Sequence, residues 1–186
     1  LQACGLDIGA DQIVSCAHGL ATVAQEAGCR GDLFFVMGNL GTPCYAEAAG
    51  LETTRRLADL PNCRGVIVGE DNYDWEPVLN AVVNFFIDHP EALLITPNPD
   101  EYYPDGQGSI RLAAGSVARF IQRALTTYGR PKAPLFLGKP HLPIFHTAHQ
   151  RLEQVAGGVI EKNRVLMIGD NLDSDVAGAT AFGYRT

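Results

Sequence analysis

Three carboxylates stand close together near the C-terminus of this chain. Asp170, Asp173 and Asp175 lie within six residues, directly after the apolar run 165–168 and Gly169. Such a run, ended by glycine, is typical of a buried strand that leaves a parallel sheet. Like charges at this spacing repel one another, so a bound cation is expected to neutralise them. Oxygen ligands at the end of a parallel strand indicate a Mg²⁺ site that can also contact a phosphate.

An acidic turn exposed to solvent is the alternative interpretation of the same residues. In that case Ser174 or Asp173 serves only as the N-cap of the helix-like stretch 176–182. A metal site therefore needs support from a second motif.

A lysine follows a second short strand upstream. The apolar stretch 133–137 is followed by Gly138 and Lys139. After this loop, residues 144–155 have apolar side chains at the spacing of a helix. Two successive strand–loop–helix units place both loops at the carboxyl edge of one parallel sheet, where open α/β folds bind ligands. Lys139 can thus neutralise an anionic substrate while the carboxylates hold the metal ion. The two motifs together favour a metal and phosphate site over the exposed turn.

These residues resemble signature motifs of the haloacid dehalogenase (HAD) superfamily of phosphohydrolases. Residues 138–140 (Gly-Lys-Pro) resemble its third motif, and residues 169–175 resemble its fourth. Residues 95–100, 114–116 and 181–186 are similar to one branch, subfamily IIA. That branch contains p-nitrophenyl phosphatases, pyridoxal phosphate phosphatases and bacterial nucleotide phosphatases. Its members carry a large α/β cap inserted between the second and third motifs.

The resemblance implies an α/β protein with a Rossmann-like HAD core, here partial and built on a parallel sheet, and a large inserted α/β cap. Residues 1–12 are expected to be the end of a core helix and a linker, residues 13–105 the cap, and residues 106–186 the C-terminal part of the core. The stretch 97–108, at the end of the cap, is rich in proline and glycine and is expected to form a hinge or lid loop. The two sheets are expected to be separate, with strands 33–37, 66–68 and 93–96 in the cap and strands 135–137 and 165–168 in the core.

The resemblance also implies roles for single residues. Lys139 would be the catalytic residue of this segment, binding phosphoryl oxygens and stabilising the charge of the transition state. Asp170 would bind Mg²⁺ directly or through water, and Asp175 would complete the metal site by orienting that water or would hold Lys139. The phosphate pocket would be lined by backbone amides at a helix start, those of Asn171, Leu172, Asp173 and Ser174. For Asp173, helix capping alone is an equal alternative.

The first motif of the superfamily, an apolar strand followed by Asp-x-Asp, is not found in this chain. That spacing occurs at residues 173–175, inside the fourth motif, whereas the acids of residues 70–74 are spaced differently. Thr96 is rejected as the second motif because Pro97 follows it at once. The chain is therefore expected to be a piece of a longer phosphatase that hydrolyses small phosphate monoesters through an aspartyl-phosphate intermediate, and to be inactive by itself. The alternative is a relative that binds phosphate or metal without catalysis, or an interaction module.

The composition limits the partners. The 186 residues carry a net charge of −7, which argues against nucleic acid or an anionic membrane as the main partner. No apolar run is long enough to span a membrane. None of the five cysteines forms a C-x-x-C pair, which favours reduced thiols in a cytoplasmic protein. The expected partner is a small phosphorylated metabolite, and a homo-oligomer formed through the cap is left open.

Overall fold

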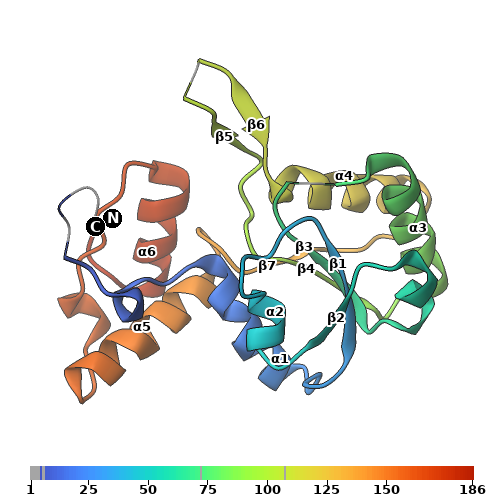
Figure 1. The fold of residues 1–186 in the computed structure, drawn as a ribbon. Coiled ribbons are helices and arrows are strands. Elements are labelled where there is room, and N and C mark those ends of the chain that lie inside the picture. Colours follow the sequence, from blue (N-terminus) through green and yellow to red (C-terminus); the bar gives the residue numbers. More distant parts are fainter. Residues whose placement is uncertain (1–4, 6, 72, 107) are drawn as a thin grey trace.

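Residue 5 and residues 7–71, 73–106 and 108–186 are described in the computed structural model of this chain (Figure 1). The strands are β1 (Leu33–Met37), β2 (Glu52–Thr54), β3 (Gly65–Val68), β4 (Leu93–Thr96), β5 (Tyr102–Pro104), β6 (Ile110–Leu112) and β7 (Leu135–Phe136). The α-helices are α1 (Leu20–Glu26), α2 (Tyr45–Ala48), α3 (Trp75–Asp88), α4 (Ala114–Thr127), α5 (Leu142–Ala156) and α6 (Ala177–Phe182). Short helical turns of the 3₁₀ or π type lie at Ala10–Gln12, Cys16–Gly19, Leu57–Asn62, Lys162–Arg164 and Leu172–Val176.

One parallel sheet contains five of the strands, in the order β2-β1-β3-β4-β7. The chain runs outward from β1 to β2 on one side and then crosses back to build β3, β4 and β7 on the other. The direction of winding therefore reverses between β1 and β3. In open parallel sheets, ligands bind in the crevice outside the carboxyl ends of the strands at such a reversal. The predicted α/β class with a parallel sheet is confirmed.

Helices cover both faces of this sheet (Figure 1). On one face α1 and α2 pack over buried side chains that include Phe34 and Ile67. On the other face α3 and α4 pack over Phe35 and Leu94. Successive residues of a strand point to opposite faces, so a strand covered on both sides is a continuous apolar run. For this reason β1, β3 and β4 match the strands predicted from the sequence.

β7 joins the same sheet, contrary to the sequence prediction. Ile95 pairs with Leu135 and Thr96 pairs with Phe136, both in parallel. The assignment of residues 135–137 to a separate core sheet is therefore wrong. The reason is that α4 carries the chain back along the sheet, and a strand–helix–strand unit pairs its two strands in parallel. Thr96 is fully buried in this pairing, so its side chain does not face a ligand site.

Residues 165–168 do not form the expected buried strand. Leu166 makes a single parallel bridge to Arg185, and the side chains of Leu166 and Ile168 are 60% and 85% exposed. The alternate side chains of the run pack against a separate apolar cluster of α5 and α6. The backbone N–H and C=O groups of a strand need hydrogen-bond partners on a neighbouring strand. Among the described residues, this run is paired only through the bridge between Leu166 and Arg185. The strand prediction is thus wrong at this position.

The stretch 97–108, expected to be a loop, contains β5, which pairs with β6 as an antiparallel hairpin. Tyr103 and Arg111 lie opposite each other on one face of the hairpin. The other face carries the exposed side chains of Ile110 and Leu112. The hairpin projects away from the sheet in Figure 1. A three-residue strand with charged and aromatic residues gives too short a pattern to be predicted from the sequence.

Candidate functional site

Lys139 stands on a loop that packs tightly against the end of β4. Gly138, the residue before it, donates its N–H to the carbonyl oxygen of Pro97 at 2.8 Å. A Cβ atom at position 138 would lie 2.6 Å from Cδ of Pro99 and 3.1 Å from Cβ of Cys16. Because a side chain would collide with these atoms, glycine is required, and its close packing determines where Lys139 leaves the sheet edge.

The ammonium group of Lys139 forms an ion pair with Asp175. Nζ lies 2.5 Å from Oδ1 of Asp175, whose side chain is only 6% exposed. The second oxygen, Oδ2, accepts the N–H of Asn171 at 3.2 Å. Asp175 therefore joins the loop after β7 to the loop that precedes α6. The two sequence motifs meet through this carboxylate, as expected from one of the two roles predicted for it.

The pKa of Asp175 reflects two opposing effects. Burial by itself raises the pKa, because it disfavours the charged form of the carboxyl group. The hydrogen bonds from Lys139 and from the Asn171 N–H outweigh burial, so that the pKa lies below its ordinary value. The carboxylate is therefore ionised at neutral pH and stabilises the folded state.

We expect the substitution Asp175→Asn to lower the free energy of unfolding at neutral pH by about 1–2 kcal/mol, because Lys139 loses its charged partner. The folded-state pKa of Asp175 is depressed, so the wild-type advantage is present above the unfolded-state pKa and lost as the pH falls through the folded-state pKa. Urea unfolding of both proteins, from neutral to strongly acidic pH, measures this difference.

A matched control is Asp88→Asn, at the exposed last residue of α3. This change should leave the free energy of unfolding nearly unaltered across the same pH range. A difference between wild type and Asp175→Asn that stayed constant down to strongly acidic pH would show that the ion pair is not its cause.

Asp170 and Asp173 are exposed to solvent, unlike Asp175. Mg²⁺ in proteins is often held by one or two carboxylates, with water and phosphate oxygens completing its shell. The part of the chain that the structure describes contains no group of three or more His, Cys, Asp or Glu side chains placed to hold a metal ion. Both oxygens of Asp175 already accept hydrogen bonds, from Lys139 and from the N–H of Asn171, whereas Asp170 is exposed to solvent.

Asn171 is the N-cap of the turn that follows Asp170. Its side-chain oxygen accepts the N–H of Asp173 at 2.9 Å and that of Ser174 at 3.0 Å. The interpretation of Ser174 or Asp173 as the N-cap is therefore wrong. The chain enters a π-type turn at Leu172, and the side chain one residue earlier reaches both amides. Together with the N–H of Asn171, which donates to Asp175, three of the four amides expected to line a phosphate pocket are thus hydrogen-bonded within this segment.

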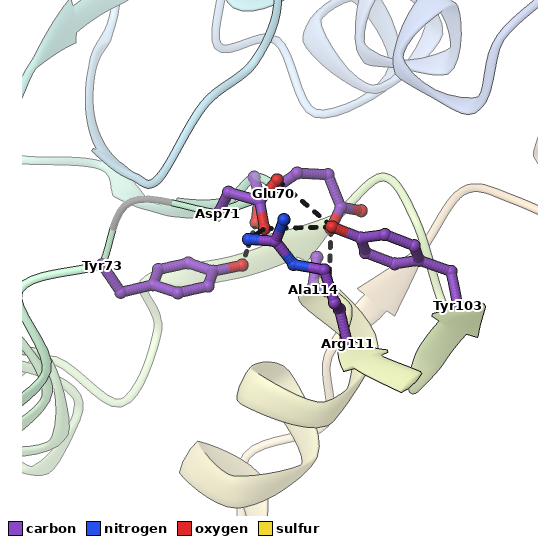
Figure 2. Close-up of polar contacts among 7 residues, drawn as sticks. Glu70, Asp71, Tyr73, Tyr103, Arg111 and Ala114 are labelled. Atoms are coloured by element: carbon purple, nitrogen blue, oxygen red, sulfur yellow. Dashed lines mark hydrogen bonds and ion pairs between the residues drawn. The ribbon is translucent and has the colours of Figure 1, made fainter. Parts of the chain in front are cut away.

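Glu70, at the end of β3, connects segments that are distant in the sequence. It accepts a hydrogen bond from Nδ2 of Asn98 at 2.7 Å, and one from the N–H of Ala114 at 3.1 Å. Ala114 begins α4, so Glu70 attaches this helix to the end of β3 (Figure 2). Through Asn98 it also attaches the loop after β4. Burial raises the pKa of Glu70, against the lowering effect of these two hydrogen bonds.

Asp71 binds the hairpin on the other side of the same loop. The hydroxyl of Tyr103 donates to Oδ1 of Asp71 at 3.3 Å, and Nη2 of Arg111 lies 3.6 Å from the same oxygen (Figure 2). From the sequence, the acidic residues of the segment 70–74 are not assigned to a catalytic motif, because their spacing is not Asp-x-Asp. The signal that could have revealed them is their place directly after a buried strand, in a fold that binds ligands at strand ends.

Comparisons with known proteins agree with the motifs. Residues 136–186 match the model of the HAD-hydrolase-like family. Human chronophin is 31% identical over 159 residues, which cover 81% of this chain and 47% of chronophin. The structure of a p-nitrophenyl phosphatase from Archaeoglobus fulgidus is similar with a TM-score of 0.77 at 23% identity, covering 99% of this chain and 64% of that one. These likenesses confirm the predicted fold class.

A glycerol phosphate phosphatase from Mycobacterium tuberculosis, solved in complex with magnesium, is also similar. Its TM-score is 0.76 at 23% identity, covering 97% of this chain and 50% of that one. The chain spans about half the length of the curated relatives it matches. The resemblance indicated by the Gly-Lys-Pro and Gly-Asp motifs is confirmed.

Proposed function

From this confirmed resemblance to the HAD phosphatases of subfamily IIA, we propose that the full-length protein is a Mg²⁺-dependent phosphatase of small phosphate monoesters. The observation that carries the proposal is the ion pair between Lys139 and Asp175 beside the exposed Asp170. The ion pair holds the Lys139 ammonium group in a defined direction, and Asp170, five residues before Asp175 in the chain, is the carboxylate that we assign to the metal ion. Such a pair suits a phosphoryl group, which carries negative charge and shares oxygens with Mg²⁺.

Each residue then has a distinct task. Lys139 contacts phosphoryl oxygens and stabilises the charge that builds up when phosphorus is attacked. Asp175 is a positioning residue, because it fixes the direction of the Lys139 ammonium group. Asp170 would hold Mg²⁺, which would supply further positive charge beside the phosphate. The turn of residues 171–174 borders the phosphate.

The covalent step needs an attacking carboxylate. In the proposed reaction an aspartate oxygen forms a bond to phosphorus as the ester oxygen leaves, and an acid two residues further on protonates that oxygen. Water then hydrolyses the acyl phosphate and releases inorganic phosphate. The sequence offers Asp-x-Asp only at residues 173–175, where Asp175 already holds Lys139. The nucleophile is therefore assigned to a part of the protein outside this chain.

We also propose a division into domains. It differs from the division expected from the sequence, because the sheet extends beyond residue 105. A boundary between residues 105 and 106 would separate β4 from β7, which are paired. We place the end of the cap near residue 137 instead, so that the whole five-stranded sheet belongs to the cap begun at residue 13. The third and fourth motifs then belong to the core. Self-association through the cap is compatible with this division.

We also propose that the protein is located in the cytoplasm. Cys16, Cys29, Cys44 and Cys63 carry free thiols, whereas Cys4 lies outside the described residues. Free thiols are typical of a reducing compartment such as the cytoplasm. Within residues 5 and 7–186, apart from 72 and 107, no helix has the length and apolar character needed to cross a bilayer.

Release of inorganic phosphate from p-nitrophenyl phosphate by the full-length protein tests the proposal. We expect turnover that requires Mg²⁺ and stops when EDTA is added. Absence of turnover with a broad panel of phosphate esters would overturn the proposal and favour a relative that binds phosphate or metal without catalysis.

A further inference from the structure

A small hollow lies at the carboxyl ends of β1, β3 and β4, where the winding of the sheet reverses. Its volume is about 210 Å³. The loop after β1 contributes Asn39 and Leu40, the loop after β3 contributes Glu70, and the loop after β4 contributes Asn98. Tyr45, at the start of α2, closes one side. This is the position at which open parallel sheets bind ligands, and the volume suits a group of a few non-hydrogen atoms.

The hollow adjoins the loop that carries Lys139. Cys16 and Pro97 belong to its wall. A Cβ atom at Gly138 would lie 3.1 Å from Cβ of Cys16 and 3.0 Å from the carbonyl oxygen of Pro97, so the backbone of Gly138 packs directly against that wall. Lys139 is the next residue. The hollow is therefore in contact with the residue that directly precedes the proposed phosphate-binding lysine.

Glu70 determines the charge of this hollow. Among the described residues that line it, there is no lysine or arginine and Glu70 is the acidic side chain. A carboxylate offers about four lone-pair positions, and Glu70 uses one on each oxygen, for Asn98 and for the N–H of Ala114. Acceptor capacity remains for a further donor. The neighbouring carboxylate of Asp71 is instead ion-paired with Arg111, which does not line the hollow (Figure 2).

We propose that the hollow receives the alcohol part of the phosphate ester and that Glu70 selects alcohols that are uncharged or cationic and rejects carboxylated ones. The inference rests on the proposed phosphatase function and narrows its substrate class. A hydroxyl or ammonium group can donate a hydrogen bond to Glu70, whereas a second carboxylate placed in the hollow would be repelled by it. The partly buried position of Glu70 strengthens both effects, because water screens the charges less there.

The test compares kcat/KM of the full-length protein for phosphoethanolamine, glycerol phosphate and 3-phosphoglycerate, whose alcohol parts are cationic, neutral and anionic. We expect wild type to prefer the first two. Glu70→Gln should reduce this preference over 3-phosphoglycerate by roughly tenfold, equivalent to about 1.4 kcal/mol. Glutamine keeps the size and one acceptor of Glu70 but removes the charge. Glutamine loses one of the two hydrogen bonds that Glu70 accepts, so thermal melting of both proteins is measured as well. The ratio of kcat/KM between two esters within one protein reports selection independently of the folded fraction.

The matched control is Glu47→Gln, which removes the same charge from an exposed residue of α2 that does not line the hollow. Its selectivity should equal that of wild type. A wild-type preference for 3-phosphoglycerate, or a selectivity of Glu70→Gln within about twofold of wild type, would overturn the inference while leaving the phosphatase function intact.

If the protein hydrolyses none of these esters, nor p-nitrophenyl phosphate, the proposed function fails and direct binding decides the inference. NMR shifts of the amides of residues 70 and 98 would then be followed on addition of ethanolamine or glycerate. Binding of ethanolamine in preference to glycerate, lost in Glu70→Gln, supports the inference. Equal binding of the two compounds, or no binding, overturns it.

Discussion

Lys139→Ala and Asp170→Asn are each expected to lower kcat/KM of the full-length protein for p-nitrophenyl phosphate by roughly 10²–10³-fold. Lys139 is the cation of the site, and its removal takes away charge that stabilises the transition state. Asp170 is exposed, so its replacement should weaken Mg²⁺ binding without disturbing the fold. For Asp170→Asn, the loss should therefore be partly recovered at high Mg²⁺ concentration, and no such recovery is expected for Lys139→Ala.

The controls for this prediction separate chemistry from folding. Lys139→Ala leaves the buried carboxylate of Asp175 without its partner, so its stability must be measured alongside activity. Lys132→Ala removes a lysine whose Nζ binds the carbonyl oxygen of Pro90, and it should keep full activity. Wild-type rates in folded Asp170→Asn at limiting Mg²⁺ would contradict the assignment of the metal site.

The 186-residue chain alone is expected to release no p-nitrophenol above background in the same assay. It supplies the charge-stabilising and metal-binding residues but no aspartate that can attack phosphorus, and loss of a covalent nucleophile costs many orders of magnitude. Robust turnover would mean that the nucleophile lies within the chain. Asp7 and Asp71 would then be the first residues to replace, although Asp71 is engaged with Tyr103 and Arg111.

Gly138→Ala is expected to impair both stability and activity. The new Cβ would lie 2.6 Å from the ring carbon Cδ of Pro99 and 3.0 Å from the carbonyl oxygen of Pro97, and neither atom can move without shifting backbone. Overpacking of this kind typically costs about 1–3 kcal/mol. The loop must move away from β4 and takes Lys139 with it, and a misplacement of about 1 Å at a catalytic group can cost roughly 10²-fold in rate.

Urea unfolding and kcat/KM for p-nitrophenyl phosphate measure the two effects. The control is Gly158→Ala, since a Cβ at that glycine would meet no atom within 4 Å. It should leave stability and rate close to those of wild type. If Gly138→Ala were as stable and as active as Gly158→Ala, the packing of the Lys139 loop against β4 would not determine the position of the lysine.

The sequence by itself determined the elements whose pattern is local. β1, β3 and β4 are apolar runs because both faces of the sheet are covered, and α3 has apolar residues at helical spacing. The two motifs around Lys139 and Asp170 were also visible, because chemistry at strand ends leaves glycine and charged residues at short spacings. These features depend only on residues close together in the chain.

Only the tertiary structure decided which segments meet. The apolar stretch at β7 does not encode its partner, and the crossover through α4 placed it beside β4. The run 165–168 has the composition of a strand, but the described residues supply one bridge and leave Ile168 exposed. The contacts of Glu70 with Asn98 and Ala114 span 28 and 44 residues. The spacing of apolar residues indicates which side chains are buried. Pairing between distant segments depends instead on the path of the whole chain. The hollow next to the Lys139 loop, which three separate loops form, could therefore not be predicted from residue spacing.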